Sequence, residues 1–174
     1  DVDRSRGLGD VYKRQSLHAA KTARKWFEDI CEIPCYVDFA SEYRYRNPIV
    51  ENNTLFVTIS QSGETADTLA ALNYAKDEKY VGIVSICNVP TSTMARESDW
   101  KVFTNAGPEI GVASTKAFLG QLTVLYILCL KLAFIRNNID ENTYVKNITN
   151  LKKLPEAIKT CLKSESNVQL MAKE

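Results

Sequence analysis

Hydrophobic residues near the start of the chain recur with a period of about 3.6 residues. Ala20, Ala23 and Phe27 follow this spacing, which predicts an amphipathic helix over residues 16–30. Similar patterns predict four further helices, over residues 41–46, 62–78, 92–99 and 111–138. We expect Ser41 to cap the first of these four, because its side chain can accept a hydrogen bond from a free N–H at the helix start.

Short apolar runs alternate with these helices. They predict strands over residues 54–60, 80–87 and 100–103, and a further extended run over residues 35–40. Strands separated by helices of ten or more residues are typical of a parallel sheet, whose crossover helices cover both faces. The pattern therefore predicts an α/β fold with helices on both faces of a parallel sheet.

The two ends of the chain depart from this alternation. Residues 1–15 carry charges and glycines with little apolar periodicity, and we expect them to be a non-native segment left by sequencing or assembly. Residues 16–138 form the predicted domain, and residues 139–174 form a helical extension with one apolar face. That face consists of Leu151, Leu154, Ile158 and Leu162.

Length, charge and cysteine content limit the classes of function. A chain of 174 residues with a formal net charge of +1 fits one domain and has no electrostatic footprint for nucleic acid or a membrane surface. The apolar stretch 122–135 is shorter than the ~18–20 residues of a membrane span, so we expect a buried or interface helix. Five cysteines without a CxxC pair, and a single histidine, argue against a zinc site. Scattered thiols suit a reducing compartment, so we expect a cytoplasmic protein.

Candidate chemistry lies where the first predicted strand ends and a helix begins, in the run 60–65 (SQSGET). Ligands of open α/β sheets bind at the carboxyl ends of the strands, and a helix N-terminus favours an anion. Ser60, Ser62 and Thr65 supply hydroxyl donors, and Gly63 allows close approach of the backbone. The run therefore indicates a phosphate site, while ordinary helix capping by Ser62 and Thr65 is the alternative.

A second hydroxyl-rich helix start lies in the run 111–116 (GVASTK). Ser114 is a candidate cap, Thr115 a first-turn hydroxyl, and Lys116 either a charge near the ligand or a solvated surface lysine. Carboxyl ends of parallel strands meet at one edge, so both helix starts would open onto the same rim. Neither a G-x-x-x-x-G-K-[ST] motif nor a G-x-G-x-x-G motif is present, which argues against an ordinary P-loop and against a dinucleotide site.

Several runs carry a resemblance to a known family. Residues 58–72, with an S-x-S-G-x-T core, resemble the phosphate-binding loop of SIS (sugar isomerase) domains. Residues 31–46 and 103–118 resemble more specifically the first SIS domain of the glutamine–fructose-6-phosphate aminotransferase family, and residues 85–99 fit the same pattern. The resemblance extends over residues 16–138.

This resemblance implies a five-stranded, flavodoxin-like parallel sheet and a site for a hexose 6-phosphate, either fructose 6-phosphate or glucosamine 6-phosphate. It implies neither a metal nor an organic cofactor. The implied binding residues are Ser16, Ser60, Gln61, Ser62, Thr65, Val112 and Ser114. The loop from Ser60 to Thr65 and Ser16 would hold the phosphate, while Val112 and Ser114 would contact the sugar.

The resemblance also implies partners that lie outside these residues. In the family, a glutaminase domain precedes the SIS pair, and the second SIS domain and a C-terminal lysine complete catalysis. We therefore expect residues 139–174 to lead toward a second SIS domain, the chain alone to bind sugar phosphate without turnover, and a homodimer to form. Gln15 stands where the family has a threonine, which puts the start of the site in doubt.

Two other functions stay open from the sequence. A phosphosugar-sensing module of a regulator would need a DNA-binding helix-turn-helix, which residues 1–15 are too short to supply. A stand-alone phosphosugar isomerase would need an acid/base pair within the chain. We expect His18 to be a surface residue, and Glu64 and Glu109 to stabilise loops and helix starts rather than to catalyse.

Overall fold

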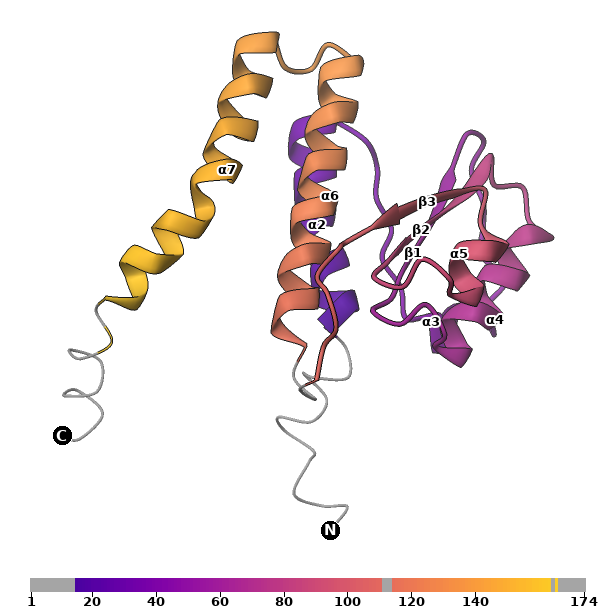
Figure 1. Cartoon of the computed structure of the whole chain (residues 1–174). Coiled ribbons are helices and arrows are strands. Elements are labelled where there is room, and N and C mark those ends of the chain that lie inside the picture. Colours follow the sequence, from indigo (N-terminus) through magenta and orange to yellow (C-terminus); the bar gives the residue numbers. More distant parts are fainter. Residues whose placement is uncertain (1–14, 111–113, 164, 166–174) are drawn as a thin grey trace, which may run out of the picture.

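Three parallel strands form the sheet at the centre of the fold (Figure 1). The computed structural model describes residues 15–110, 114–163 and 165. β1 (Leu55–Ile59), β2 (Gly82–Cys87) and β3 (Trp100–Phe103) lie in the order β1-β2-β3. β2 is the most buried of the three because it has a strand on each side and helices on both faces. The three predicted strands are confirmed, each within a residue or two of the expected bounds.

Helices cover both faces of this sheet, as the alternation predicts. α4 (Ala66–Lys76) and α5 (Thr93–Glu97) pack on one face, where Leu72 and Met94 are fully buried against β2. α2 (Gln15–Cys31) and α6 (Thr115–Ile135) lie side by side on the other face (Figure 1), where Ala19 and Leu125 contact the opposite side of β2. The α/β fold with helices on both faces of a parallel sheet is therefore confirmed.

The segment from Cys35 to Ala40 differs from the prediction. Residues 32–39 have no regular secondary structure, because no strand in the described part of the chain pairs with them or with the free edge of β1. The short helix α3 begins at Ala40 and ends at Tyr43, with Phe39 at its N-cap and no capping side chain, so the predicted cap at Ser41 is wrong. Three strands of the implied five lie within the described residues.

A long helical hairpin forms the last part of the described chain. α6 continues through a turn at Asn137 into α7 (Glu141–Leu162), whose start is capped by the Asp140 carboxylate accepting from the Thr143 N–H at 2.8 Å. No residue of α7 is buried, and Ile158 and Leu162 on its predicted apolar face are exposed. Its second half points away from the sheet (Figure 1). Its role as a linker stays a prediction.

α6 is the one helix among the described residues that is long and apolar enough to cross a membrane. It is longer than the apolar stretch suggested, but its buried side chains, including Leu125 and Cys129, face α2 and the sheet. α6 also buries the polar side chain of Gln121. Packing of this kind identifies a core helix of the α/β domain.

The predicted non-native segment at the N-terminus falls on residues 1–14, which lie outside the described part, apart from Gln15, the first residue of α2.

Candidate functional site

The carboxyl edge of the sheet positions the loop that follows β1. Beyond the last paired strand residues, the Ser60 N–H donates to the Ile86 carbonyl at 3.0 Å, and the Asn88 N–H donates to the Gln61 carbonyl at 3.1 Å. These bonds extend the β1–β2 ladder into the loop. The loop therefore leaves the sheet in a defined direction, toward the start of α4.

Ser60 organises the turn inside this loop. Its side chain is buried, and its Oγ accepts from the Gly63 N–H at 3.1 Å and lies 3.2 Å from the Thr65 Oγ1. Gly63 has a φ of +68°, and a Cβ there would lie 2.3 Å from Ser92 Oγ, so only glycine fits without rearrangement. The turn is thus held by the hydrogen bond to Ser60 Oγ on one side and by close packing against Ser92, the N-cap of α5, on the other.

The start of α4 carries hydroxyl groups that do not cap it. Thr65 is the N-cap residue, and its side chain makes no capping hydrogen bond. Ser62 Oγ accepts from the Glu64 N–H at 3.1 Å, before the helix begins. Ordinary capping by Ser62 and Thr65 is therefore wrong for this helix, and its first turn lacks a side-chain acceptor. Such a helix end attracts an anion.

Glu64 serves the neighbouring helix rather than the site. Its Oε1 accepts from the Thr93 N–H at 2.6 Å, at the first residue of α5. The backbone hydrogen bond from Thr93, followed by the side-chain hydrogen bond from the same residue, lowers the pKa of the Glu64 carboxyl below its ordinary value. The carboxylate is thereby committed to α5, which confirms the expected structural role of Glu64.

The second helix start is partly satisfied by its own loop. Ser114 is the N-cap residue of α6 and makes no capping hydrogen bond, but Glu109 Oε2 accepts from the Ala117 N–H at 3.0 Å. Lys116 Nζ is exposed and donates to the Pro108 carbonyl at 2.8 Å. Glu109 thus has the loop role expected of it, and Lys116 is a surface lysine. Val112 lies outside the described residues.

Asn88 holds this second loop and was not found from the sequence. Its Nδ2 donates to the Gly107 carbonyl at 2.8 Å, and its Oδ1 accepts from the Ala106 N–H at 2.8 Å and from Thr104 Oγ1 at 3.1 Å. Asparagine is common in loops that follow strands, so its presence in the sequence did not indicate that Asn88 holds the second loop. Its position beside the ladder bond to Gln61 links the two loops.

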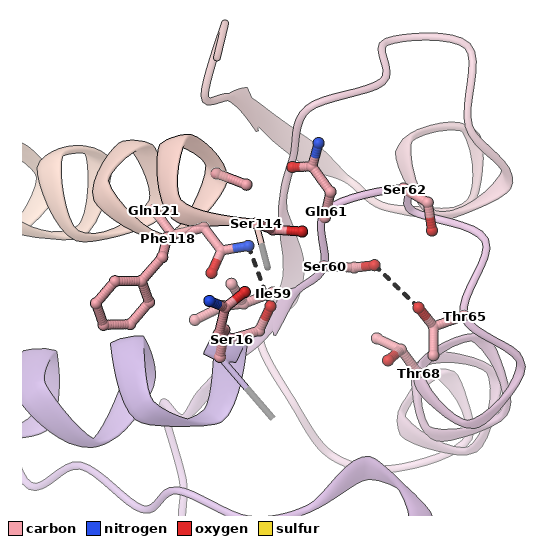
Figure 2. A pocket seen from close by; sticks show the side chains of 12 residues that line it. Ser16, Ile59, Ser60, Gln61, Ser62, Thr65, Thr68, Ser114, Phe118 and Gln121 are labelled. Atoms are coloured by element: carbon pink, nitrogen blue, oxygen red, sulfur yellow. Dashed lines mark hydrogen bonds between the residues drawn. The ribbon is translucent and has the colours of Figure 1, made fainter. Parts of the chain in front are cut away.

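A cavity of about 330 Å³ opens between the two loops and the start of α2 (Figure 2). In Figure 2 the Ser60 side chain points toward Thr65, and the Ser114 hydroxyl points from α6 toward the loop after β1. Twelve described residues line the cavity, and six of them belong to the predicted set. Those six are Ser16, Ser60, Gln61, Ser62, Thr65 and Ser114.

Other lining residues were missed because they come from helix faces, or in one case from the last position of β1, and belong to no motif. They are Gln15, Ile59, Thr68, Ala117, Phe118 and Gln121. Gln121 is the most informative, because it is a buried amide in an apolar helix. In the sequence, a glutamine within the apolar run of this helix was the one feature that could have indicated its place in the cavity.

The described lining of the cavity is rich in neutral donors and has no ionisable side chain. Hydroxyls and amides can bind an anion or a polyol, but they cannot exchange protons near neutral pH as a general acid or base does. His18, the sole histidine, is exposed on α2 and does not line the cavity. No group of three or more His, Cys, Asp or Glu side chains that could hold a metal occurs in the described residues.

The fold and the site define an α/β domain with a parallel sheet and a candidate anion site at an uncapped, hydroxyl-rich helix start on its carboxyl edge. The family described as SIS domain matches residues 13–131, and the chain belongs to this family.

Individual relatives narrow the resemblance. The chain is 46% identical over 157 residues to a glutamine–fructose-6-phosphate aminotransferase of Pseudomonas syringae pv. tomato, a match that covers 90% of the chain and 26% of that protein. It is also 46% identical over 159 residues to the enzyme of the same name from Escherichia coli K12, covering 91% and 26%. The resemblance to this aminotransferase family is thereby confirmed.

A solved structure supports the same assignment. The C-terminal domain of glucosamine-fructose-6-phosphate aminotransferase from Francisella tularensis superposes with a TM-score of 0.87 at 44% identity, covering 90% of the chain and 44% of that structure. Against the two full-length aminotransferases above, the chain spans about a quarter of their length.

Proposed function

We propose that this chain is the sugar-phosphate-binding first SIS domain of a glutamine–fructose-6-phosphate aminotransferase, with fructose 6-phosphate or glucosamine 6-phosphate as its ligand. The observation that carries the proposal is the start of α4, where Ser60, Ser62 and Thr65 gather beside a helix end without a capping side chain. Membership in the SIS family and the similarity to the aminotransferases support this ligand class.

The neutral lining favours binding without turnover. Isomerisation of a sugar phosphate moves a proton between carbon atoms, which requires a general base. The described lining offers none, so the alternative of a self-sufficient isomerase has no support from the cavity. In this proposal, catalytic groups come from further domains of the whole enzyme, and the reaction needs no metal.

Partners and location follow the same proposal. The exposed apolar side chains of α7, including Ile158 and Leu162, suit contact with further parts of the enzyme or with a second copy in a homodimer. None of the five cysteines forms a disulfide, which suits the reducing cytoplasm.

Titration calorimetry of the 174-residue chain with fructose 6-phosphate tests the proposal. We expect weak binding that chelators do not change, and much weaker binding of unphosphorylated fructose. Ser62→Ala should lower the affinity by about ten- to a hundredfold, because a hydrogen bond to a charged group contributes about 1.5–3 kcal/mol. Ser41→Ala is the matched control, since Ser41 is exposed on α3 and does not line the cavity. Equal affinities of the unsubstituted chain and Ser62→Ala would remove the α4 loop from the site.

A further inference from the structure

Gln121 stands out as a polar residue on the buried side of an apolar helix. Its side chain is 2% exposed, among neighbours on α6 such as Leu125 and Ala117 that are equally buried. Burying a primary amide costs free energy unless its donors and acceptor find partners. A buried glutamine in such a stretch therefore needs an explanation in terms of what it bonds.

The amide is only half satisfied by the protein. Gln121 Nε2 donates to Ser16 Oγ at 3.1 Å, as drawn in Figure 2, and joins α6 to the first turn of α2 across 105 positions of sequence. Gln121 Oε1 is buried and has no hydrogen-bond partner in the described structure. Native proteins leave few buried acceptors in this state, and those that persist often mark functional sites.

The donor–acceptor chemistry determines what Ser16 can do. An amide nitrogen only donates, so the Ser16 oxygen is the acceptor in this bond. The Ser16 hydroxyl hydrogen is then free to donate elsewhere, and Ser16 lines the cavity opposite the α4 loop. A serine whose oxygen is held in this way is oriented as a donor to an anion, with less rotational freedom to lose on binding.

We propose that Gln121 is a positioning residue that holds the Ser16 hydroxyl as a hydrogen-bond donor to the phosphate bound in the cavity. The proposal rests on the proposed function and deepens it, because it adds a residue of α6 that acts through Ser16 rather than on the ligand directly. The unpartnered oxygen is the stability cost of keeping an amide at this position.

Replacement of Gln121 by methionine separates positioning from packing. Gln121→Met keeps an unbranched side chain of similar length and removes both polar atoms. A purely structural role for the amide predicts a lower thermal midpoint, whereas removal of a buried unpartnered oxygen leaves the midpoint unchanged or raises it. We expect the affinity for fructose 6-phosphate to fall about three- to tenfold, as loss of one neutral hydrogen bond implies, without a lower midpoint.

A double-substitution cycle on the 174-residue chain gives the decisive measurement. In a Ser16→Ala background, Gln121→Met should cause no further loss of affinity, because the group it positions is gone. In a Ser62→Ala background, the two losses should multiply, because Ser62 belongs to the α4 loop. Gln121→Leu provides a second variant should the methionine protein fail to fold.

The possible results separate the positioning role of Gln121 from the proposed sugar-phosphate binding of the chain. Unchanged affinity in Gln121→Met, alongside a loss in Ser62→Ala, would overturn the positioning role and leave the proposed function standing. Multiplying losses with Ser16→Ala would overturn it as well, since Gln121 would then act independently of Ser16. Absence of fructose 6-phosphate binding by the unsubstituted chain would remove the proposed function and this inference together.

Discussion

The loops that precede α4 and α6 have similar residue types but differ in what they offer to a ligand. Before α4, the carboxylate of Glu64 turns to the neighbouring helix α5, and the α4 start keeps its hydroxyls for the cavity. Before α6, the carboxylate of Glu109 bonds the first turn of α6 itself, at the Ala117 N–H. Each start has a carboxylate nearby, Asp67 in the first turn of α4 and Glu109 at α6, but only Glu109 accepts a hydrogen bond from its helix start. The α4 start is therefore the one whose N–H groups have no side-chain acceptor, and we propose it as the phosphate site, with α6 contacting the rest of the ligand.

The two loops also differ in how tightly they are packed. A Cβ added at Gly63 in the first loop would lie 2.3 Å from Ser92 Oγ, while one added at Gly107 in the second would meet nothing within 4 Å, although both glycines have φ near +70°. A side chain is thus disfavoured at Gly63 by both its positive φ and a clash with Ser92, and at Gly107 by its positive φ alone. Substitution of each residue in turn can break or sharpen this comparison.

The largest expected effect is that of Gly63→Ala. A Cβ at this position meets Ser92 Oγ at 2.3 Å and Ser92 Cβ at 2.6 Å, in addition to the cost of a positive φ. We expect a loss of about 2–5 kcal/mol in unfolding free energy and loss of measurable sugar-phosphate binding. Gly107→Ala is the matched control, with a cost of about 1 kcal/mol from its φ alone. Urea unfolding of both variants measures the difference, and equal losses would contradict the packing argument.

Ser60→Ala should have the next largest effect, and it should act on both stability and binding. It leaves the Gly63 N–H without its acceptor in a buried turn, at a cost of about 1–3 kcal/mol, and removes a phosphate donor. Ser114→Ala should change the stability by less than about 0.5 kcal/mol and the affinity by about two- to tenfold. Thermal unfolding and calorimetry on the two variants provide the comparison. A greater loss of affinity in Ser114→Ala would move the anion to α6.

Acid titration should reveal a smaller contribution from Glu64. Its pKa in the folded chain lies below its ordinary value because of the Thr93 hydrogen bonds, so the carboxylate binds its proton less readily when the chain is folded. Its stabilising contribution is present above about pH 4.5 and is lost as the pH falls through the lower, folded value. Glu64→Gln should remove this part of the acid dependence, as measured by unfolding at pH 7 and in steps below pH 5. If the unfolding free energies of the unsubstituted chain and Glu64→Gln fell in parallel with pH, the stabilising role of the Glu64 carboxylate would be contradicted.

The smallest expected signal is turnover, which should be zero. Neither loop presents its carboxylate to the cavity, since Glu64 and Glu109 both accept from backbone N–H groups. We expect the purified chain to make no glucosamine 6-phosphate from fructose 6-phosphate with glutamine or ammonia. A sensitive product assay against an enzyme-free control measures this. Product above the control would show that an acid/base group reaches the ligand and would favour a self-sufficient enzyme.

Much of the fold follows from local patterns. Strand and helix periods placed β1, β2 and β3 and the helices between them, because burial on a pleated strand or a helix face imposes its period on neighbouring residues. Cys35–Ala40 shows where this reasoning fails, since an extended, apolar segment becomes a strand only when another strand pairs with it. The predicted cap at Ser41 is wrong for a related reason, because the N-cap position falls on Phe39, two residues before Ser41, so Ser41 lies inside the helix.

The sequence by itself determined the types of group at the candidate site: hydroxyls and a glycine placed between a strand and a helix, a combination that favours an anion at the carboxyl edge of a parallel sheet. Only the tertiary structure decided which groups meet in the cavity. It turned Glu64 and Glu109 toward backbone N–H groups and brought Gln121 to Ser16 from 105 positions away. The physical reason is that side-chain chemistry and periodicity are local properties, whereas hydrogen-bond partners across two packed helices depend on how those helices lie against each other on the sheet.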